Sequence, residues 1–279
     1  MASPGRGLDW EDADRPPLER LEARLASYRS LVVAFSGGVD SAVLLATAHR
    51  VLADRVIAVI ADSPSLPRLE LHQACDLAAQ IGVRLEILPT TEVDRPEYIA
   101  NDRGRCYFCK QTLFHACSDF ARESAITDIA YGYTLDDASD IRPGHTAAQQ
   151  FGVHAPLHDA RLRKADVRAV ARELGLPVWD KPAAPCLSSR IPHGTTVTRD
   201  KLAKIEGMES VLHDLGFAEC RARFDGSSMR IEVPSGEIGR LATDGVRDVV
   251  LRTANLLAIP FLSIDLEGFA SGKLHRTVA

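Results

Sequence analysis

The chain has 279 residues, of which 46% are hydrophobic and 25% are charged, and its formal net charge is −5. These ordinary globular values exclude a disordered chain, a collagen-like chain and a coiled coil, and the length predicts one large domain with a smaller one. The acidic balance argues against a protein that grips long nucleic acid, because that requires a broad basic surface.

The N-terminal segment carries no apolar stretch like that of a signal peptide, and the apolar runs elsewhere are only as long as strands. We therefore expect no membrane span and a cytoplasmic location. In that reducing compartment, the six cysteines favour metal binding or catalysis over disulfides. Residues 1–17 are polar and proline-containing, and we expect a disordered tail there.

Strand and helix patterns alternate over residues 18–193, the expected first domain. Strands are expected at 31–35, 55–61, 84–88 and 128–133, and helices at 18–29, 42–52, 66–81 and 164–174. Uninterrupted apolar strands are typical of a sheet that is covered on both faces. The alternation predicts an α/β fold with a doubly wound parallel sheet.

The pattern changes after a linker rich in proline and glycine that ends near residue 193. The following elements are expected to be a helix at 199–215, a hairpin of 219–224 and 229–233, a short helix near 236–243 and a strand near 258–264. This order predicts a small α+β domain over 194–267 for substrate binding or oligomerisation. Residues 268–279 are expected to be a tail.

A glycine-rich segment, SGGVDS, follows the first predicted strand and opens a helix. Gly37 and Gly38 allow positive φ angles and a close approach of the backbone to a ligand. The N–H groups of the loop and helix start favour an anion, above all a phosphate. Ser36 and Ser41 add hydroxyl donors, and Asp40 suits a helix cap or a magnesium ligand. The segment is neither a Walker loop nor GxGxxG, and a simple glycine-rich turn is the structural alternative.

SGGVDS resembles the PP-loop of the N-type ATP pyrophosphatases, which cleave ATP to AMP and pyrophosphate and attach AMP to a substrate oxygen. Further segments narrow the resemblance: GRCYFCK at 104–110, GYTLDDASDIRPG at 132–144, PCLSSRIPHGT at 185–195 and CRARFDGSSMRIEV at 220–233. Together they resemble LarE, the family of ATP-dependent sacrificial sulfur transferases, from about residue 18 to 266.

The resemblance implies an enzyme of nickel-pincer nucleotide cofactor biosynthesis. Such an enzyme adenylates a carboxylate of pyridinium-3,5-dicarboxylate mononucleotide and converts it to a thiocarboxylate, using ATP and magnesium. The resemblance also implies a homo-oligomer, a hexamer. It implies that the protein binds a small-molecule mononucleotide, and we expect no binding to nucleic acid or a membrane.

Three cysteines carry the sulfur chemistry that the resemblance implies. Cys186 matches the sulfur-donor position, where a thiolate attacks the activated carboxylate and loss of its sulfur leaves dehydroalanine. Cys106 and Cys109 form a CxxC. With Cys186 they match three ligands of the 4Fe-4S cluster that some family members use, which leaves one iron open for hydrosulfide. Both routes stay open, and the sequence favours the cluster because the sacrificial route gives the CxxC no task. Buried structural thiols are the alternative, and we expect that role for Cys75, Cys117 and Cys220.

Acidic residues of TLDDASD are implied to face the nucleotide, with Asp137 as the ATP contact and Asp136 and Asp140 beside it. A solvated loop with a helix cap is the structural alternative. Arg142, which follows, suits a phosphate or solvent.

Arg221 and Arg223 alternate along one predicted strand, so both face one side and suit a substrate phosphate. The resemblance implies that role for them and for Arg190, which also suits stabilisation of the Cys186 thiolate. Glu232 lies across the predicted hairpin and matches an acidic, candidate metal-binding position, with Glu209 as its companion. An exposed salt bridge is the structural alternative for this pair.

Two other functions compete. A tRNA thiolase shares the PP-loop and cysteine-borne sulfur, but the acidic charge and the lack of an added basic domain argue against it. A non-catalytic nucleotide-binding or iron–sulfur protein would bind ATP without releasing pyrophosphate.

Overall fold

The computed structural model describes residues 15–139 and 143–270, and these fold as two compact units. The first unit is built from the chain up to Ser63 together with Arg68–Glu92 and Cys106–Ala184. The second unit contains Pro64–Pro67, Val93–Arg105 and the chain from Pro185 onward. The sequence predicted a boundary at 193/194. Compared with that prediction, the second unit also contains residues 185–193 and two segments from the first half of the sequence, Pro64–Pro67 and Val93–Arg105.

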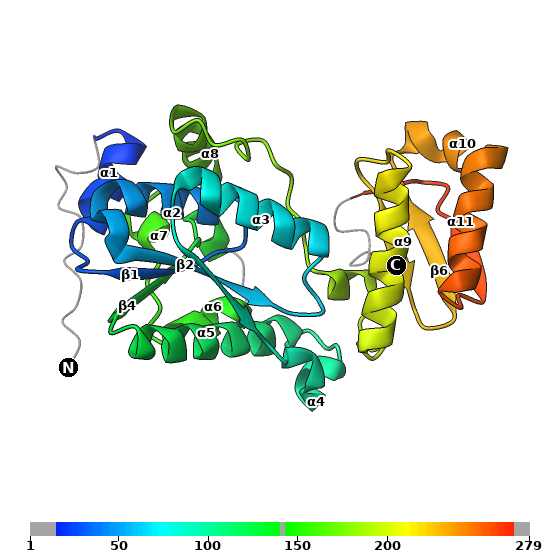
Figure 1. Cartoon of the computed structure of the whole chain (residues 1–279), viewed down its shortest axis with the longest axis horizontal. Coiled ribbons are helices and arrows are strands. Elements are labelled where there is room, and N and C mark those ends of the chain that lie inside the picture. Colours follow the sequence, from blue (N-terminus) through cyan, green and yellow to red (C-terminus); the bar gives the residue numbers. More distant parts are fainter. Residues whose placement is uncertain (1–14, 140–142, 271–279) are drawn as a thin grey trace. The chain divides into compact units, whose positions relative to one another are not determined.

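The first unit is a four-stranded parallel sheet between helices, which confirms the predicted α/β class (Figure 1). Its strands are β1 (Leu31–Ala34), β2 (Val56–Asp62), β3 (Leu85–Pro89) and β4 (Asp128–Tyr131). Its helices are α1 (Pro17–Leu25), α2 (Val39–Leu52), α3 (Arg68–Ile81), α6 (Pro143–Gln150), α7 (Pro156–Asp159), α8 (Lys164–Glu173) and nearly all of α5 (Arg105–Glu123).

The strand order β3-β2-β1-β4 places the change of direction between β1 and β4. In doubly wound sheets a ligand binds at such a point, beyond the carboxyl ends of the strands. Ala34, the last residue of β1, pairs with Tyr131, the last residue of β4. The loops that leave these two strands therefore start side by side.

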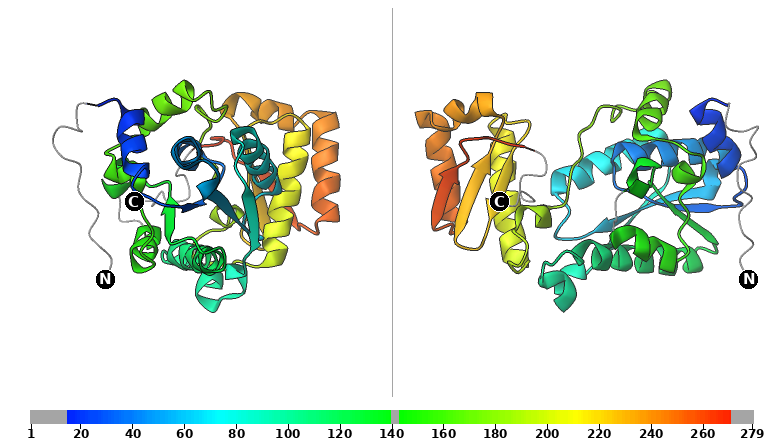
Figure 2. Two further views of the ribbon diagram at one scale, coloured as in Figure 1. Left: turned by 60° about the vertical axis from the view of Figure 1, so that its left-hand side comes forward. Right: turned by 180° about the vertical axis from the view of Figure 1, so that it is seen from behind.

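Helices cover both faces of this sheet. Helices α1, α2, α3 and α8 lie on one face, and α5 and α6 lie on the other (Figures 1 and 2). Phe114 and Cys117 from α5, with Ala147 from α6, join Val32 and Ile129 of the strands in one buried cluster. Our strand prediction left residues 89–127 without an element, although α5 supplies much of this packing.

The second unit combines the predicted hairpin with helices. Its strands β5 (Arg221–Phe224), β6 (Ser228–Glu232) and β7 (Phe261–Ile264) form a sheet in which β5 and β6 are antiparallel and β6 and β7 are parallel. Its helices are α4 (Pro96–Ile99), α9 (Arg199–Asp214), α10 (Ile238–Leu241) and α11 (Asp244–Leu256). Helix α9 packs against β5 and α11 packs against α9. Helix α11 was not predicted.

No helix within 15–139 and 143–270 has the length and apolarity needed to cross a bilayer.

Candidate active site

The SGGVDS loop curls tightly over the start of α2. Gly37 has φ +69°, and a Cβ there would lie 2.9 Å from the Cβ of Ala74, so a larger residue would be both strained and crowded. The Ser41 hydroxyl donates to the carbonyl of Gly38 at 3.0 Å and accepts the N–H of Ser36 at 3.2 Å. These bonds hold the loop open around the N-terminus of a 14-residue helix, which is a favourable place for a phosphate.

A second loop closes on the first from the end of β4. A Cβ at Gly132 would lie 2.8 Å from the backbone nitrogen of Ser41 and 3.0 Å from the carbonyl carbon of Asp40. Only glycine therefore lets the two loops approach so closely. They enclose a cavity of about 110 Å³, lined by Ala34, Phe35, Ser36, Gly38, Asp40, Ser41, Lys110, Leu113, Tyr131 and Gly132.

Lys110 brings a positive charge to the wall of this cavity from α5. The aliphatic part of the Lys110 side chain packs closely against Gly144 of α6, since a Cβ built on Gly144 would lie only 2.9 Å from the Lys110 Cγ. Lys110 was not predicted as a site residue, although it directly follows Cys109 in GRCYFCK. Its proximity to SGGVDS depends on α5 packing under β1 and β4, which no local pattern reveals.

Lys164 joins the two loops. Its ammonium donates to Oδ2 of Asp40 in the first loop and, at 3.1 Å, to Oδ2 of Asp137 in the second. Its backbone N–H, at the first residue of α8, donates to Oδ2 of Asp136 at 2.6 Å. Asp136 thus caps α8, which matches the structural alternative considered for this segment. Lys164 was not predicted as a site residue. A lysine at the start of a helix, directly after an arginine, carries no local pattern that indicates a contact with these aspartates.

The two aspartates that share this lysine differ in pKa. Burial raises the pKa of Asp40 above its usual value, and the hydrogen bond and charge of Lys164 oppose that rise only in part. Burial acts in the same direction on Asp137. Bonds from the Thr134 N–H and hydroxyl, at 3.0 and 2.9 Å, and from Lys164 outweigh it, so the pKa of Asp137 is lowered. Asp137 is therefore held as a carboxylate.

These carboxylates suit a magnesium ion that arrives with nucleotide phosphates. The Oδ1 atom of Asp40 is buried and has no hydrogen-bond partner among the described residues. Within the same residues, no three histidine, cysteine, aspartate or glutamate side chains gather as a metal site. Magnesium commonly uses only one or two carboxylates and takes its other ligands from phosphates and water. Asp40 and Asp137 therefore suit an ion that takes its remaining ligands from a nucleotide and water.

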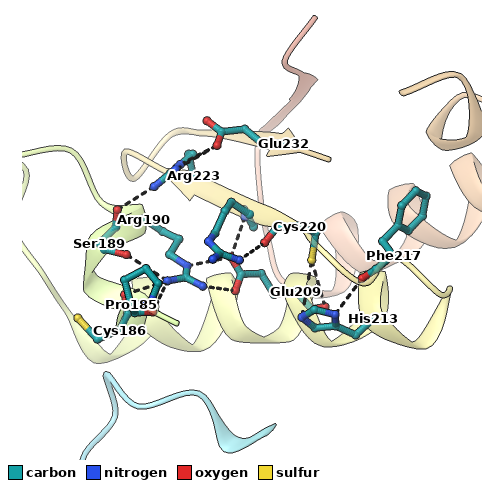
Figure 3. A network of polar contacts seen from close by, with 12 residues as sticks. Pro185, Cys186, Ser189, Arg190, Glu209, His213, Phe217, Cys220, Arg223 and Glu232 are labelled. Atoms are coloured by element: carbon teal, nitrogen blue, oxygen red, sulfur yellow. Dashed lines mark hydrogen bonds and ion pairs between the residues drawn. The ribbon is translucent and has the colours of Figure 1, made fainter. Parts of the chain in front are cut away.

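The second unit fixes the backbone around Cys186. Cys186 precedes a short 3₁₀ turn, Leu187–Arg190, whose last residue is 3% exposed. The Arg190 guanidinium bonds both carboxylate oxygens of Glu209 at 3.0 Å and donates to the Cys186 carbonyl at 3.0 Å (Figure 3). The Cys186 sulfur points away from this network in Figure 3. The Arg190 side chain thus contacts backbone carbonyls of the segment around Cys186. All three nitrogens of its guanidinium bond protein groups.

A segment distant in sequence holds the other side of the same turn. The hydroxyl of Tyr98 lies 2.7 Å from that of Ser188, and Arg105 donates to the Ser188 carbonyl at 2.9 Å. The buried Asn101 side chain donates to the carbonyls of Pro192 and Thr195 at 2.9 and 2.8 Å. Since these partners lie about ninety residues away in the chain, sequence reasoning missed this clamp.

Arginines and acids share one face of the hairpin, as the alternation predicted. Arg221 pairs with Glu232 across the strands, and Arg223 pairs with Arg230. Glu232 is fully buried and forms ion pairs at 3.1 Å with Arg223 and 3.2 Å with Arg230, so it is not the exposed pair of the structural alternative. Arg223 also donates to the Ser189 carbonyl at 2.9 Å.

Arg221 differs from its neighbours because, among the described residues, it forms no ion pair with a carboxylate. It donates to its neighbouring Cys220 carbonyl at 2.7 Å and lies 5.0 Å from the centre of the Phe269 ring. Burial, and then the nearby Arg190 charge, lower the pKa of Arg221. Arg190 and Arg223, the other two arginines predicted to bind a phosphate, are paired with carboxylates. The charge of Arg221 is thus the one most accessible to an external anion.

Known proteins resemble this chain over nearly all its length. A family model described as NAD synthase matches residues 20–101. An uncharacterized protein of Synechocystis is 37% identical over 261 residues, which cover 94% of this chain and 97% of that protein. The pyridinium-3,5-bisthiocarboxylic acid mononucleotide synthase of Lactiplantibacillus plantarum is 34% identical over 259 residues, covering 92% of this chain and 93% of that protein. The chain belongs to the LarE family.

More distant relatives share part of this LarE chain. A GMP synthase of Leifsonia xyli is 29% identical over 242 residues, matching 75% of this chain and 47% of that protein. This agrees with the predicted PP-loop superfamily.

None of the six cysteines of this LarE chain, all of which lie in the described residues, forms a disulfide. Cys106 is exposed, and Cys109, one turn later in α5, is partly buried. Cys186, in the second unit, is also partly buried. Burial raises the pKa of Cys117 and of Cys220 to about 12, so neither is a ready thiolate. Asp140 and Arg142, named from the sequence, lie outside the described residues.

Proposed function

We propose that this LarE protein is an ATP-dependent sulfur transferase that converts a carboxylate of pyridinium-3,5-dicarboxylate mononucleotide to a thiocarboxylate. The observation that carries the proposal is the similarity to the synthase of L. plantarum, together with a free Cys186 on a buried, hydrogen-bonded turn. The reaction belongs to nickel-pincer nucleotide biosynthesis.

The first step is adenylation at the PP-loop. Ser36, Gly37, Gly38 and Ser41 present backbone and hydroxyl donors to the ATP phosphates, and Lys110 adds a charge at the cavity wall. A substrate carboxylate attacks the α-phosphorus, and pyrophosphate leaves. Asp40 and Asp137 would hold magnesium, which neutralises phosphate charge when it is bound.

The second step transfers sulfur. The Cys186 thiolate attacks the acyl carbon of the adenylate and AMP leaves, which gives a thioester. Removal of the Cys186 α-proton with cleavage of its Cβ–S bond then releases a thiocarboxylate and leaves dehydroalanine. No oxidant or reductant is needed, because the elimination moves only a proton and an electron pair.

A reusable route is open to the same residues. The thiols of Cys106, Cys109 and Cys186 form no disulfide and suit a 4Fe-4S cluster that would carry labile sulfide, and none of the three is fully buried. The LarE resemblance supports this route, since the three cysteines match the ligands of the cluster that some family members use.

The substrate phosphate is assigned to the hairpin. Arg221 is the first ligand, since its guanidinium carries no carboxylate partner among the described residues. Arg223 and Arg190 are assigned as neighbours that contribute positive potential while remaining paired with Glu232 and Glu209. Glu232, paired with two arginines, would bind a metal only if it exchanged these partners.

The cellular setting is part of the proposal. Free thiols suit a reducing compartment such as the cytoplasm. The LarE resemblance supports a homo-oligomer, a hexamer, which light scattering of the purified protein would measure.

The test combines pyrophosphate release with mass spectrometry on anaerobically purified protein. With ATP, magnesium and the dicarboxylate, we expect pyrophosphate and a thiolated product, and Cys186→Ala should abolish thiolation while sparing pyrophosphate release. Asp40→Ala should lose pyrophosphate release. A chain that becomes lighter by one hydrogen sulfide identifies the sacrificial route, whereas iron and labile sulfide identify the cluster. Thiolation by Cys186→Ala, or ATP binding without pyrophosphate release, would refute the proposal.

A further inference from the structure

Lys164 occupies the point where the two nucleotide loops meet. Its ammonium bonds Oδ2 of Asp40 and Oδ2 of Asp137, and its backbone N–H bonds Asp136. The pairing of β1 with β4 brings these loops together, so the contact is built into the sheet rather than into a local motif. One lysine therefore lies between carboxylates that come from opposite sides of the topological switch point.

Asp40 and Asp137 repel each other as carboxylates, and the Lys164 ammonium that they share offsets part of that repulsion. The Arg168 charge also acts on Asp40, although its guanidinium bonds the carbonyls of Trp179 and Lys181. The other Asp40 oxygen, Oδ1, is buried without a hydrogen-bond partner among the described residues. Asp40 therefore keeps a buried acceptor that Lys164 does not use.

Lys164 is also able to move. Its side chain is 41% exposed, whereas that of Asp137 is 3% exposed and is fixed by Thr134. A lysine ammonium is a point charge on a flexible stem, so it can exchange oxygen partners without a fixed geometry. Polyphosphate oxygens in the adjoining cavity would offer it new charge-assisted hydrogen bonds.

We propose that Lys164 is a resident counter-ion that occupies the cation position between Asp40 and Asp137 until magnesium arrives with a nucleotide. Asp40 and Asp137 would then hold the divalent ion, and the Lys164 ammonium would be free to bond phosphate oxygens. Lys164 is thus a positioning residue that makes divalent-cation binding depend on the nucleotide. This inference rests on the proposed function only in naming ATP as that nucleotide.

The test measures divalent-cation binding in the full chain without nucleotide or pyridinium substrate. Manganese(II) serves as the probe, because its free form is counted directly by electron paramagnetic resonance. We expect Lys164→Met to lower the manganese dissociation constant by about tenfold or more, since manganese no longer has to displace the Lys164 ammonium from the aspartates. Lys164→Arg, which restores the charge, should return binding to the weak wild-type level.

A matched control is Lys181→Met. Lys181 is another partly buried lysine of the first unit, and it bonds Glu70 at 2.7 Å and Gln73 at 2.9 Å. Its removal should leave manganese binding at the wild-type level. Adding Asp40→Asn to Lys164→Met should abolish the gained affinity, which assigns the ion to this pair.

Manganese binding by Lys164→Met that is no tighter than wild type would overturn the inference, as would an equal gain in Lys181→Met. If the methionine variant does not fold, Lys164→Gln removes the charge but keeps a polar N–H donor, and the same gain is expected. This binding assay needs no turnover. A failure here would leave sulfur transfer untouched, whereas a lack of pyrophosphate release would refute the proposed function alone.

Discussion

The Arg190–Glu209 pair should be the main polar determinant of stability around the sulfur-donor turn. The two side chains are only 4% and 8% exposed, and two parallel bonds of 3.0 Å join them. Replacing Arg190 with methionine leaves the Glu209 carboxylate buried with the Ala222 N–H as its remaining donor, at 2.9 Å. Breaking one side of such a buried pair costs about 3–5 kcal/mol.

Arg199 provides a control with the same fork geometry on the surface of the same unit. It bonds Asp94 at 3.1 and 2.7 Å, but the two side chains are 55% and 54% exposed. Solvent and salt screen such a pair, so Arg199→Met should cost less than about 1 kcal/mol. Both substitutions remove a two-bond fork to a carboxylate, and Arg190→Met also removes bonds to the carbonyls of Pro185 and Cys186. Burial of the fork and these additional bonds together predict the larger effect of Arg190→Met.

Amide hydrogen exchange read by mass spectrometry suits this comparison, because two units need not unfold in a single transition. Peptides covering β5 contain the Ala222 N–H that reports directly on Glu209. A loss of about 3–5 kcal/mol corresponds to about two to four powers of ten in exchange rate. The reasoning is refuted if Arg190→Met raises exchange there by less than about threefold, or if Arg199→Met has the same effect.

Three further predictions concern the nucleotide loop, the hairpin and the substrate phosphate. Gly132→Ala should abolish ATP binding measured by calorimetry, because its Cβ would lie 2.8 Å from the nitrogen of Ser41. Bonds from Ser228 and Ser227 lower the pKa of Asp225 below 3.8, so its contribution to hairpin stability is present above that pH and lost as the pH falls through the folded-state value. In the wild-type protein, amide exchange should therefore show a more stable hairpin at about pH 6 than at about pH 3, and in Asp225→Asn this difference in stability should be smaller. Arg221→Met should weaken mononucleotide binding by about tenfold or more without changing ATP binding, in line with loss of a charge-assisted bond.

Each of these predictions has a control or a contrary outcome. Gly239→Ala, in α10, adds a Cβ that meets no atom within 4 Å, so ATP binding should be unchanged. Unaltered ATP binding by Gly132→Ala would contradict the close approach of the two loops. A pH dependence of exchange that is identical in Asp225→Asn would assign the acid sensitivity to other carboxylates. For Arg221→Met, parallel losses in mononucleotide and ATP affinity would indicate a folding defect rather than a phosphate contact.

Local patterns in the sequence were sufficient for the first unit's strands and for the nucleotide loop. Apolar runs such as Leu31–Phe35 indicate strands buried on both faces, because only a sheet covered by helices on each side makes every position apolar. SGGVDS carries its own signal, since glycines and a helix start within one short segment are enough to predict a phosphate site. The alternation of Arg221 and Arg223 likewise fixes their shared face by the period of a strand.

Tertiary structure alone decided how these pieces are supported. Lys164 reaches Asp40 across 124 positions of sequence, and Asn101 reaches Thr195 across 94, so no window of local sequence contains either contact. The pairing of β1 with β4 creates the first contact, and the return of residues 93–105 to the second unit creates the other. Burial, which turns the Arg190–Glu209 pair from a weak surface interaction into a strong constraint, depends on the folded packing of both partners. The sequence could therefore predict candidate reacting groups, but the charges and clamps around them follow from the fold.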